Sequence, residues 1–417
     1  NDTWGHGVPD LYAALSPITT SKNPLSFGGG GGSGGGGSGG GGSGNAMPFS
    51  AMKKYPVSQT SFTSSSSLGN SISNGLKNKY TYAYDALHGG FKLYLSDFIN
   101  EENLESQKIE INLIDEIEKL NSFEIHNKIS KNIFKGEFFN FKNQYNYGPS
   151  ITLDNPSLAI QNTIPKNNFY TNPFLSENNG VGLNQKLYIS GNDLFLSYSN
   201  SKINPLTNIN HDIILPLEIF AASLNLNNNV FEKFSLTTGI LKEKESFLLS
   251  KSSGAFGFEN ENVTNFYGVN LIKNFNKNQN FSFSNTFGFS NFNNNNNNFI
   301  LGSKDVMSTS FEIDYEVNNF FGNDKFNITF SQPNRVERGE MNFRLIGLSD
   351  KNGIIPFKDH KINLSPSGRQ KDLTLSYKKS MNKNIKLGLK TIITDDIGHI
   401  KNRGVNTEFL LTGSVSF

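Results

Sequence analysis

The strongest constraint on the fold is a two-residue alternation of aromatic and small polar residues in the second half of the chain. In residues 281–290, phenylalanine alternates with small polar residues or glycine (Phe281, Phe283, Phe287 and Phe289 against Ser282, Ser284, Thr286, Gly288 and Ser290). Successive side chains of a β-strand point to opposite faces, so this pattern places the rings on one face. The alternation returns at residues 311–317, 326–330, 341–345 and 372–377. We therefore predict an all-β, antiparallel fold with one apolar and one polar face.

Strand length and connections bear on the choice between a soluble sheet and a membrane barrel. The stretches 280–292, 308–321 and 404–417 are long enough for a membrane strand of roughly 9 to 11 residues, whereas strands of soluble proteins average about 5 or 6. The Asn-rich run 291–298 and the shorter turn 379–383 indicate long loops at one end and tight turns at the other. These features favour an outer-membrane β-barrel of about 12 strands, although a soluble antiparallel sheet alternates in the same way.

Composition excludes several other classes of protein. The 417 residues carry 38 basic and 36 acidic side chains, a formal net charge of +2, which excludes a nucleic-acid-coating protein. Cysteine is absent, so the fold is not stapled by disulfides, and no run of about 20 apolar residues predicts a membrane-spanning helix. The hydrophobic fraction is only 35%, but a barrel needs apolar residues at only every second strand position.

A glycine tract interrupts the chain near its beginning. Residues 28–44 repeat four or more glycines followed by a serine, a sequence that cannot bury side chains and would lose much backbone entropy on ordering. The polar, Ser-rich stretch that follows lacks a sustained period. We expect a flexible linker over residues 28–78. The glycine repeat is open to two interpretations, a natural low-complexity spacer and an engineered linker.

The 27 residues before the tract combine a turn with a short helical pattern. Gly5, His6 and Gly7 form the turn, and Pro9 stands at the first position of a helix predicted over residues 10–15. This segment resembles the C-terminal end of subtilisin-like serine peptidases, in which a glycine-rich turn leads into the last helix of the catalytic domain. The resemblance implies that residues 1–27 are the remnant of a subtilase domain and that the chain is a fragment.

The same resemblance bears on catalysis. Subtilases use an Asp, a His and a Ser, and their nucleophile precedes the segment that residues 1–27 resemble. A catalytic triad needs a base bonded to the nucleophile and an acid that orients the base, and His6 has neither partner in this sequence. We assign no catalytic residue, no cofactor-binding residue and no metal ligand, and we expect no cofactor. The parent protein is expected to be a serine endopeptidase and this chain to be inactive.

One segment of the middle region has a helical period. Leu113, Ile114, Ile117 and Leu120 follow a helical spacing, so we expect a helix within residues 101–120. A helix that threads a pore and a short surface helix are both compatible with this spacing. Residues 123–184 are rich in Asn, Pro and Gly, and we assign no structure to them.

Three motifs in the last third of the chain occur in a characteristic order. They are FSQPNRVERGEMNFRL at residues 330–345, INLSPSGRQKDLTLSY at 362–377 and DDIGHIKNRG at 395–404. Their order resembles that in the C-terminal β-domain of proteobacterial subtilase autotransporters. The element YDALHGGFKLYL at 84–95 is similar to a corner of the same family, although His88 and Gly89 depart from the Gly and Arg usual there. The resemblance implies a β-domain over residues 79–417.

The last predicted strand carries a related signal. Residues 405–417 alternate apolar and polar side chains and end on Phe417, with Gly413 at the fifth-last position. This arrangement resembles the signal by which outer-membrane barrels are recognised for insertion, and a free terminal strand can be received by strand addition. An ordinary last strand that ends in Phe remains the alternative.

Charged residues of the motif region are expected to be structural. Arginines and carboxylates there are suited to an ion-pair network on the inward face of a barrel, because charges facing lipid are costly (Arg335, Arg338, Arg344, Arg369, Glu312, Asp314, Glu316, Glu337, Glu340 and Asp372). His399 lacks a second His or Cys nearby, so we expect a turn rather than a metal site. Asp395 and Asp396 are adjacent and are likewise expected in a turn.

Three functions follow as hypotheses. The leading one is a membrane-anchoring and translocating β-domain of a secreted subtilisin-like protease, at the outer membrane or surface of a Gram-negative bacterium. Its partners would be the outer membrane, the barrel-assembly machinery and its own upstream protease domain, and no nucleic acid. The alternative is a soluble β-rich accessory domain that packs on the protease. A porin or adhesin unrelated to proteases is the third.

Overall fold

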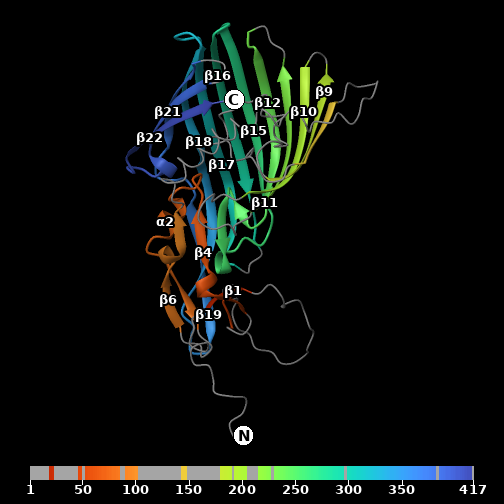
Figure 1. Ribbon diagram of the computed structural model, residues 1–417. Helices are drawn as coiled ribbons and strands as arrows, with labels where there is room; N and C mark the ends of the chain where they lie inside the picture. Colours follow the sequence, from red (N-terminus) through yellow and green to blue (C-terminus); the bar gives the residue numbers. More distant parts are fainter. Residues whose placement is uncertain are drawn as a thin grey trace, which may run out of the picture.

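The computed structural model describes two regions, a large antiparallel sheet and a smaller set of elements at one end of it (Figure 1). The described residues are 18–22, 46–48, 52–84, 90–101, 142–147, 179–189, 192–203, 215–226, 230–294, 298–381 and 385–415. Most of them lie in β-strands, and the pairs of the large sheet are antiparallel. The all-β, antiparallel expectation is confirmed.

Twelve strands form one continuous path, which we call the principal sheet. In order from one edge to the other these are β22 (Val405–Val415), β21 (Ile385–Asp395), β20 (Lys371–Ser380), β18 (Asp324–Ile346), β17 (Ile300–Asn318), β16 (Gln279–Asn291), β15 (Asn262–Asn276), β12 (Lys233–Glu243), β11 (Leu215–Leu226), β10 (Asn192–Ile203), β9 (Asn179–Ile189) and β8 (Lys142–Tyr147). Within the described residues, the edge strands β22 and β8 do not pair with each other, so a closed barrel is not found. The path is a long open sheet.

Short and long connections segregate to opposite ends of the principal sheet. At one end the strands are joined by residues 190–191, 227–232, 277–278, 319–323 and 381–384. At the other end they are joined by residues 204–214, 244–261, 292–299, 347–370 and 396–404. The expected separation of tight turns from long loops is confirmed. We call these the short-connection end and the long-connection end.

A second region, which we call the base, lies at the long-connection end. Its first part comes from the chain before residue 102: β1 (Ile18–Lys22), β2 (Ala46–Pro48), β3 (Met52–Pro56), η2 (Val57–Gln59), β4 (Ser61–Ser64), α2 (Ser71–Leu76), β5 (Tyr80–Tyr84), β6 (Gly90–Tyr94), η3 (Leu95–Phe98) and β7 (Ile99–Glu101). Its second part comes from the long connections: β13 (Ser246–Phe247), β14 (Ser250–Ser253), η6 (Gly254–Phe256) and β19 (Ile354–Asn363). Parts far apart in sequence thus build one region.

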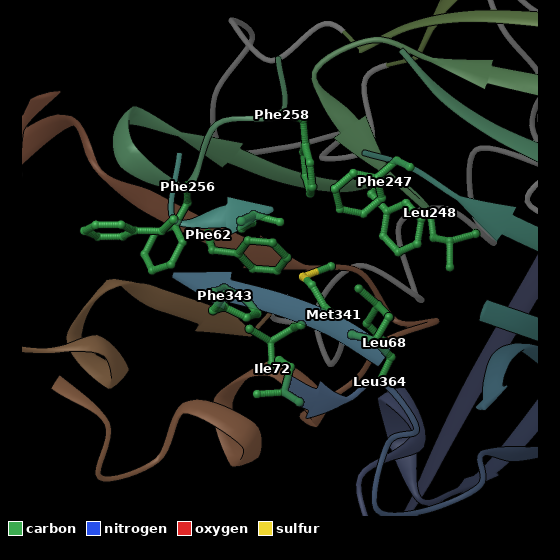
Figure 2. Packing of buried hydrophobic residues seen from close by; sticks show 14 of the residues in the cluster. Phe62, Leu68, Ile72, Phe247, Leu248, Phe256, Phe258, Met341, Phe343 and Leu364 are labelled. Carbon is green, nitrogen blue, oxygen red and sulfur yellow. The ribbon is translucent and has the colours of Figure 1, made fainter. Parts of the chain in front are cut away.

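Aromatic rings fill the interior of the base. Phe62 packs edge-on against Phe256 and Phe258, with ring centroids 6.3 and 6.2 Å apart, and Phe256 also contacts Phe343 of β18 at 6.2 Å. Figure 2 shows these rings together with Leu68 and Ile72 of one segment and Met341 of β18. The apolar side chains are buried together in the interior of the base, which is the usual arrangement in domains exposed to water.

Strand β18 belongs to both regions. Its first half pairs with β20 in the principal sheet, and its second half pairs with β19 in the base. Between the two halves the pairing with β17 is interrupted by register shifts, such as the one from Lys304 to Met307. Odd-numbered residues of β18 are buried in both halves, and the apolar residues change from even-numbered to odd-numbered positions between them. Phe330 therefore faces outward while Met341 and Phe343 are buried in the base.

The predicted end of the linker at residue 78 is wrong, because the folded part of the chain begins earlier. From Val57 the chain is folded, and Phe62, Leu68, Ile72 and Leu76 are fully buried in the base. The serines between them make specific contacts, since Ser61 Oγ lies 2.9 Å from Ser253 Oγ. The apolar residues of this segment are separated by serines, and their partners lie about 190 to 280 residues further along the chain, so the short period of Leu68, Ile72 and Leu76 was the only local signal of a core.

The structure bears on several other predictions from the sequence. Near residues 82–95 the structure describes two short strands, the antiparallel pair β5 and β6. Of residues 1–27 the structure describes β1, which pairs with β3 beyond the glycine tract, with Lys22 opposite Met52. The helices expected at residues 10–15 and within 101–120, and the terminal Phe417, lie outside the described residues. Within the described part of the chain, no helix is both long and apolar enough to span a bilayer.

Candidate functional site

The three motifs of the last third meet in space where β18 passes from the principal sheet into the base. We call this site the junction and define it by Gln332, Asn334, Arg335, Glu337, Arg369, Gln370 and His399. These residues come from the middle of β18, from the segment before β20 and from the turn η7 (Ile397–His399). The sequence order alone did not show that the motifs would touch.

Arg335 and Arg369 share one carboxylate. Arg335 Nη1 and Arg369 Nη2 each donate to Glu337 Oε2 at 2.6 Å, and Thr309 Oγ1 donates to Glu337 Oε1 at 2.8 Å. Arg335 also donates from Nε to the Gly368 carbonyl at 2.8 Å. Its Nη2 donates to the Pro366 carbonyl at 2.9 Å. The guanidinium therefore fixes the loop before β20 against β18, in the geometry of charge-assisted hydrogen bonds.

Glu337 is held as a carboxylate by its partners. Burial by itself would raise the pKa of Glu337, but hydrogen bonds from Arg369 and Thr309 and the charges of both arginines lower it below its usual value. Arg369 further donates to the side-chain oxygen of Gln332. The cluster keeps its charge over the physiological pH range and acts as a structural tie.

His399 is fully buried in the junction and both of its ring nitrogens are engaged. Its Nδ1 accepts from the backbone amide of Gln370 at 2.9 Å, so Nε2 carries the proton and donates to the Asn334 carbonyl at 3.1 Å. Burial lowers the pKa of His399 to about 3, and the charges of Arg335 and Arg369 lower it as well, although the hydrogen bond to Asn334 acts in the opposite sense. The imidazole is neutral and joins β18 to the loop before β20.

A second pair of contacts closes the turn before β22. The side-chain oxygen of Gln370 accepts from the Gly398 amide at 2.7 Å, while its amide nitrogen donates to both oxygens of Asp372 at 3.1 and 3.0 Å. Asp396 has a left-handed backbone and accepts from the Asn402 amide at 2.9 Å. The turns expected for Asp396 and His399 are confirmed, while Asp395 is the last residue of β21.

The first folded segment of the base docks on the junction. Ser67 accepts from the Val336 amide at 3.0 Å through its carbonyl, and its hydroxyl accepts from Asn334 Nδ2 at 3.1 Å. Gly69 has φ of +47°, and a Cβ there would collide with the Gly398 carbonyl oxygen. The sequence analysis missed this contribution. The spacing of Leu68, Ile72 and Leu76 at every fourth position is the helical signal that could have indicated it.

The expected ion-pair network is only partly assembled. Arg344 forms a separate bidentate pair with Asp359 at 2.7 and 2.8 Å, and Glu340 pairs with Lys361 at 3.6 Å in the base. Arg338 is not part of the junction. The remaining carboxylates of the set lie on the polar face of the principal sheet (Glu312, Asp314, Glu316 and Asp372).

The principal sheet buries its polar face and exposes its apolar face. In β16, Ser282, Ser284 and Thr286 are buried, whereas Phe289 is 40% exposed. The same holds in β17 and the first half of β18, where buried polar side chains are hydrogen-bonded between the strands, whereas in β11, β12 and β15 Leu217, Ile219, Leu241 and Phe266 are buried. Asp314 accepts from Asn327 Nδ2 at 2.7 Å and from Thr329 Oγ1 at 2.6 Å. The outward set is apolar and exposed (Leu196, Phe220, Leu236, Ile240, Tyr267, Leu389, Phe409 and Leu411).

The described side chains of the junction are engaged in hydrogen bonds within the chain. Both nitrogens of His399 are committed to hydrogen bonds, so this histidine is not poised as a general base. Among the described residues there is no group of three or more His, Cys, Asp or Glu side chains that could hold a metal ion. His6 lies outside the described residues.

Comparisons with known proteins give no further identification. Family models, curated proteins and solved structures were each compared with the chain, and none of the three comparisons gave a match. The functional conclusion therefore depends on the geometry of the sheet and the junction together with the sequence patterns.

Proposed function

We propose that the chain is the membrane-anchoring β-domain of a secreted subtilisin-like serine protease and that the principal sheet inserts in the outer membrane. The single observation that carries this proposal is the inverted burial of the sheet. Away from the long-connection end, aromatic and aliphatic side chains face outward, while serine, threonine and carboxylate side chains are buried. A soluble sheet would turn the apolar face toward a core, because exposing it to water is unfavourable.

The outward apolar band has the height of a bilayer core. In β16 it extends from Phe281 to Phe289, which spans about 27 Å along the strand at ~3.4 Å per residue. With the usual strand tilt of about 35 to 45°, this corresponds to roughly 21 Å along the membrane normal, close to the apolar band of about 25 Å in known barrels. In β18 the membrane-spanning part would be its first half, up to about Ser331, with the junction outside the bilayer.

Full insertion requires that no strand edge remains open in lipid. We propose that β8 and β22 pair with each other in the membrane and close the twelve-stranded path, since unpaired backbone groups are strongly unfavourable there. The absence of cysteine makes a clean test possible, because cysteine pairs introduced across β8 and β22 would have no competing thiol. Cross-linking in lipid for one register of pairs is the expected result. No cross-link in any register would contradict closure.

The base would lie on the membrane surface next to the protease. It sits at the long-connection end and includes β1, which belongs to the segment that resembles the end of a subtilase domain. The junction ties this base to β18 and to the turn before β22 by the hydrogen bonds of Arg335 and His399. The proposed task is to hold the protease segment at the surface of the bilayer.

A soluble accessory domain that packs on the protease is the second candidate. The observation that favours it is the base, whose interior is apolar and fully buried around Phe62 and Phe343, as in a water-soluble domain. It leaves the outward face of the principal sheet without a partner, and for this reason we rank it second.

The deciding experiment is heat-modifiable gel migration and detergent partition of the full chain, which keeps β1, β2 and β3 of the base. An anchoring domain is expected to need detergent or lipid for solubility and to migrate differently before and after boiling. A chain that stays monomeric and folded in buffer without detergent would contradict the anchoring function and support the accessory domain.

The orientation of side chains can be tested with a single tryptophan. Trp4 is the only tryptophan, so Trp4→Phe gives a background without this fluorophore. In that background, Phe289→Trp on the outward face should be quenched by brominated lipid, whereas Ser376→Trp on the polar face should not. Equal quenching at the two positions would contradict the inverted orientation.

A further inference from the structure

The two ends of the outward apolar face differ in charge. At the short-connection end, the turns and strand ends from β15 to β21 carry lysines on both faces (Lys273, Lys277, Lys325, Lys378, Lys379 and Lys386). The acidic residues of the same stretches, 273–281, 316–327 and 377–387, are Glu316 and Asp324. This end is therefore distinctly basic in a chain whose net charge is only +2.

The two acids are already engaged within the chain. Glu316 pairs with Lys325 at 2.5 Å. Asp324 accepts from the Phe321 amide at 2.9 and 2.8 Å and from the Tyr377 hydroxyl at 2.8 Å, so its carboxylate is shared among these donors. Asp324 also offsets the charge of Lys379, which lies opposite it in register, and the outward side of this end keeps the positive charges of Lys273 and Lys277 in excess.

Exposed aromatic rings accompany these lysines. Phe275, Phe320 and Phe321 are 59%, 49% and 73% exposed, and Phe320 stacks on Phe326 with centroids 5.4 Å apart. Lys273 Nζ lies 5.9 Å from the ring centroid of Phe275. Aromatic rings concentrate at both interfaces of membrane barrels, and lysine stems extend along apolar surface while the ammonium reaches the polar layer.

The long-connection end of the same face has a different electrostatic character. There Lys242 lies between two carboxylates, 3.4 Å from Glu218 and 3.6 Å from Glu261, and Tyr198 donates to Glu218 at 2.7 Å. These charges compensate one another within the chain. The excess of positive charge is therefore a property of one rim of the apolar face.

We propose that a collar at the short-connection end, formed by Lys273, Lys277, Lys379, Phe275, Phe320 and Phe321, binds the headgroups of anionic phospholipids. The proposal rests on the proposed membrane function and names the lipid class that one rim recruits. The ammonium groups complement the phosphate and its net negative charge, and the rings sit at the boundary between acyl chains and headgroups. A lipid leaflet rich in anionic headgroups is the partner that fits this rim.

The test uses the full chain reconstituted in phosphatidylcholine vesicles that contain some phosphatidylglycerol. In the Trp4→Phe background, Phe321→Trp places a reporter in the collar, and the brominated lipid is either phosphatidylglycerol or phosphatidylcholine. The ratio of quenching gives the relative affinity of the rim for the anionic lipid. We expect a preference of roughly threefold to tenfold at low salt, since each lysine near an anionic surface contributes appreciably.

The control variants separate the collar from general electrostatics. Replacing Lys273, Lys277 and Lys379 by Gln should bring the ratio to about one, as should high salt. Replacing Lys358, Lys361 and Lys401 of the base and the last turn by Gln changes the net charge equally and should leave the preference intact. An inserted protein whose ratio is one, or whose preference survives loss of the collar lysines, overturns the collar alone. No quenching by either brominated lipid overturns the proposed function and the collar with it.

Discussion

The base and the principal sheet use phenylalanine in opposite ways. In the base, Phe62 is buried among Phe256, Phe258 and Phe343, where rings from three distant segments exclude water. In the principal sheet, Phe289 and its neighbours face outward while serines on the other side of the same strand are buried. One chain thus contains a base with a buried apolar interior and a sheet with an exposed apolar face, joined along β18.

The difference shows that residue type alone does not determine burial in this chain. Along β18 odd-numbered positions are buried in both halves, but they hold polar residues in the first half (Asn327, Thr329 and Ser331) and apolar residues in the second (Met341, Phe343 and Leu345). The junction lies where this change takes place. Each prediction below tests one side of the comparison or the boundary between the two sides.

The largest effect is expected in the base. Phe62→Ala removes a fully buried ring from the aromatic cluster and should lower the free energy of unfolding by about 3 to 5 kcal/mol. Urea unfolding of the protein folded in lipid vesicles measures this loss. The matched variant Phe289→Ala on the outward face should cost much less. Equal losses at the two positions would erase the difference between the two regions.

The second-largest effect is expected on acidification, which should destabilise the junction between the base and the principal sheet. The pKa of His399 is about 3 in the folded chain, below the ordinary value of 6.5, so the unfolded chain binds more protons between these pH values. The contribution of the buried, neutral His399 to the free energy of unfolding is therefore fully present above about pH 6.5. It is lost as the pH falls toward 3, by up to about 4 kcal/mol if the junction does not open locally. Urea unfolding as a function of pH provides the measurement.

The variant His399→Gln serves as the control for this pH dependence. It should flatten the acid limb of the stability profile, whereas His360→Gln, at a more exposed site, should leave most of the limb in place. If the acid limb persists in His399→Gln, carboxylates rather than this histidine determine it.

A charge on the outward face distinguishes lipid from water as its surroundings. Leu411→Arg should lower stability in vesicles by about 2 to 4 kcal/mol if the side chain faces the bilayer core. Ser376→Arg on the polar face of β20 is the matched variant and should cost less. The measurement is unfolding in vesicles. An arginine that costs the same on either face would contradict lipid contact.

The smallest effect is expected for the arginine hydrogen bonds of the junction, which link the base to the principal sheet. Arg369→Ala should cost on the order of 1 kcal/mol, because Glu337 retains its bonds from Arg335 and Thr309. Arg335→Ala should cost more, since it also frees the carbonyls of Gly368 and Pro366. Urea unfolding of both variants gives the order. A reversed order would mean that Arg369 is the main tie.

Much of the principal sheet could be predicted from sequence because its signal is local. The alternation at residues 281–289 and 311–317 depends only on neighbours in the chain, and β16 and β17 lie where it predicted them. The base was not predictable in the same way. Its core joins Phe62 to Phe256 and Phe343, and no local pattern connects segments so distant in sequence.

For the candidate site, too, local sequence patterns predicted some features and packing between distant segments decided the others. The sequence supplied Arg335, Glu337, Arg369 and His399 as members of ordered motifs, and a turn was the correct expectation for His399. That Arg335 and Arg369 share Glu337, and that Ser67 docks beside them, depends on three-dimensional packing. Side-chain partners across a fold have no fixed sequence spacing.

The sequence by itself determined that strands would form, that each would have one apolar and one polar face, and where tight turns would separate them. The physical reason is that successive side chains of a strand point to opposite faces, so a period of two in the sequence assigns every residue to one of the two faces. Only the tertiary structure decided which face is buried, because burial depends on what packs against each face, and the segment from Val57 onward folds against one end of the sheet and buries Met341 and Phe343.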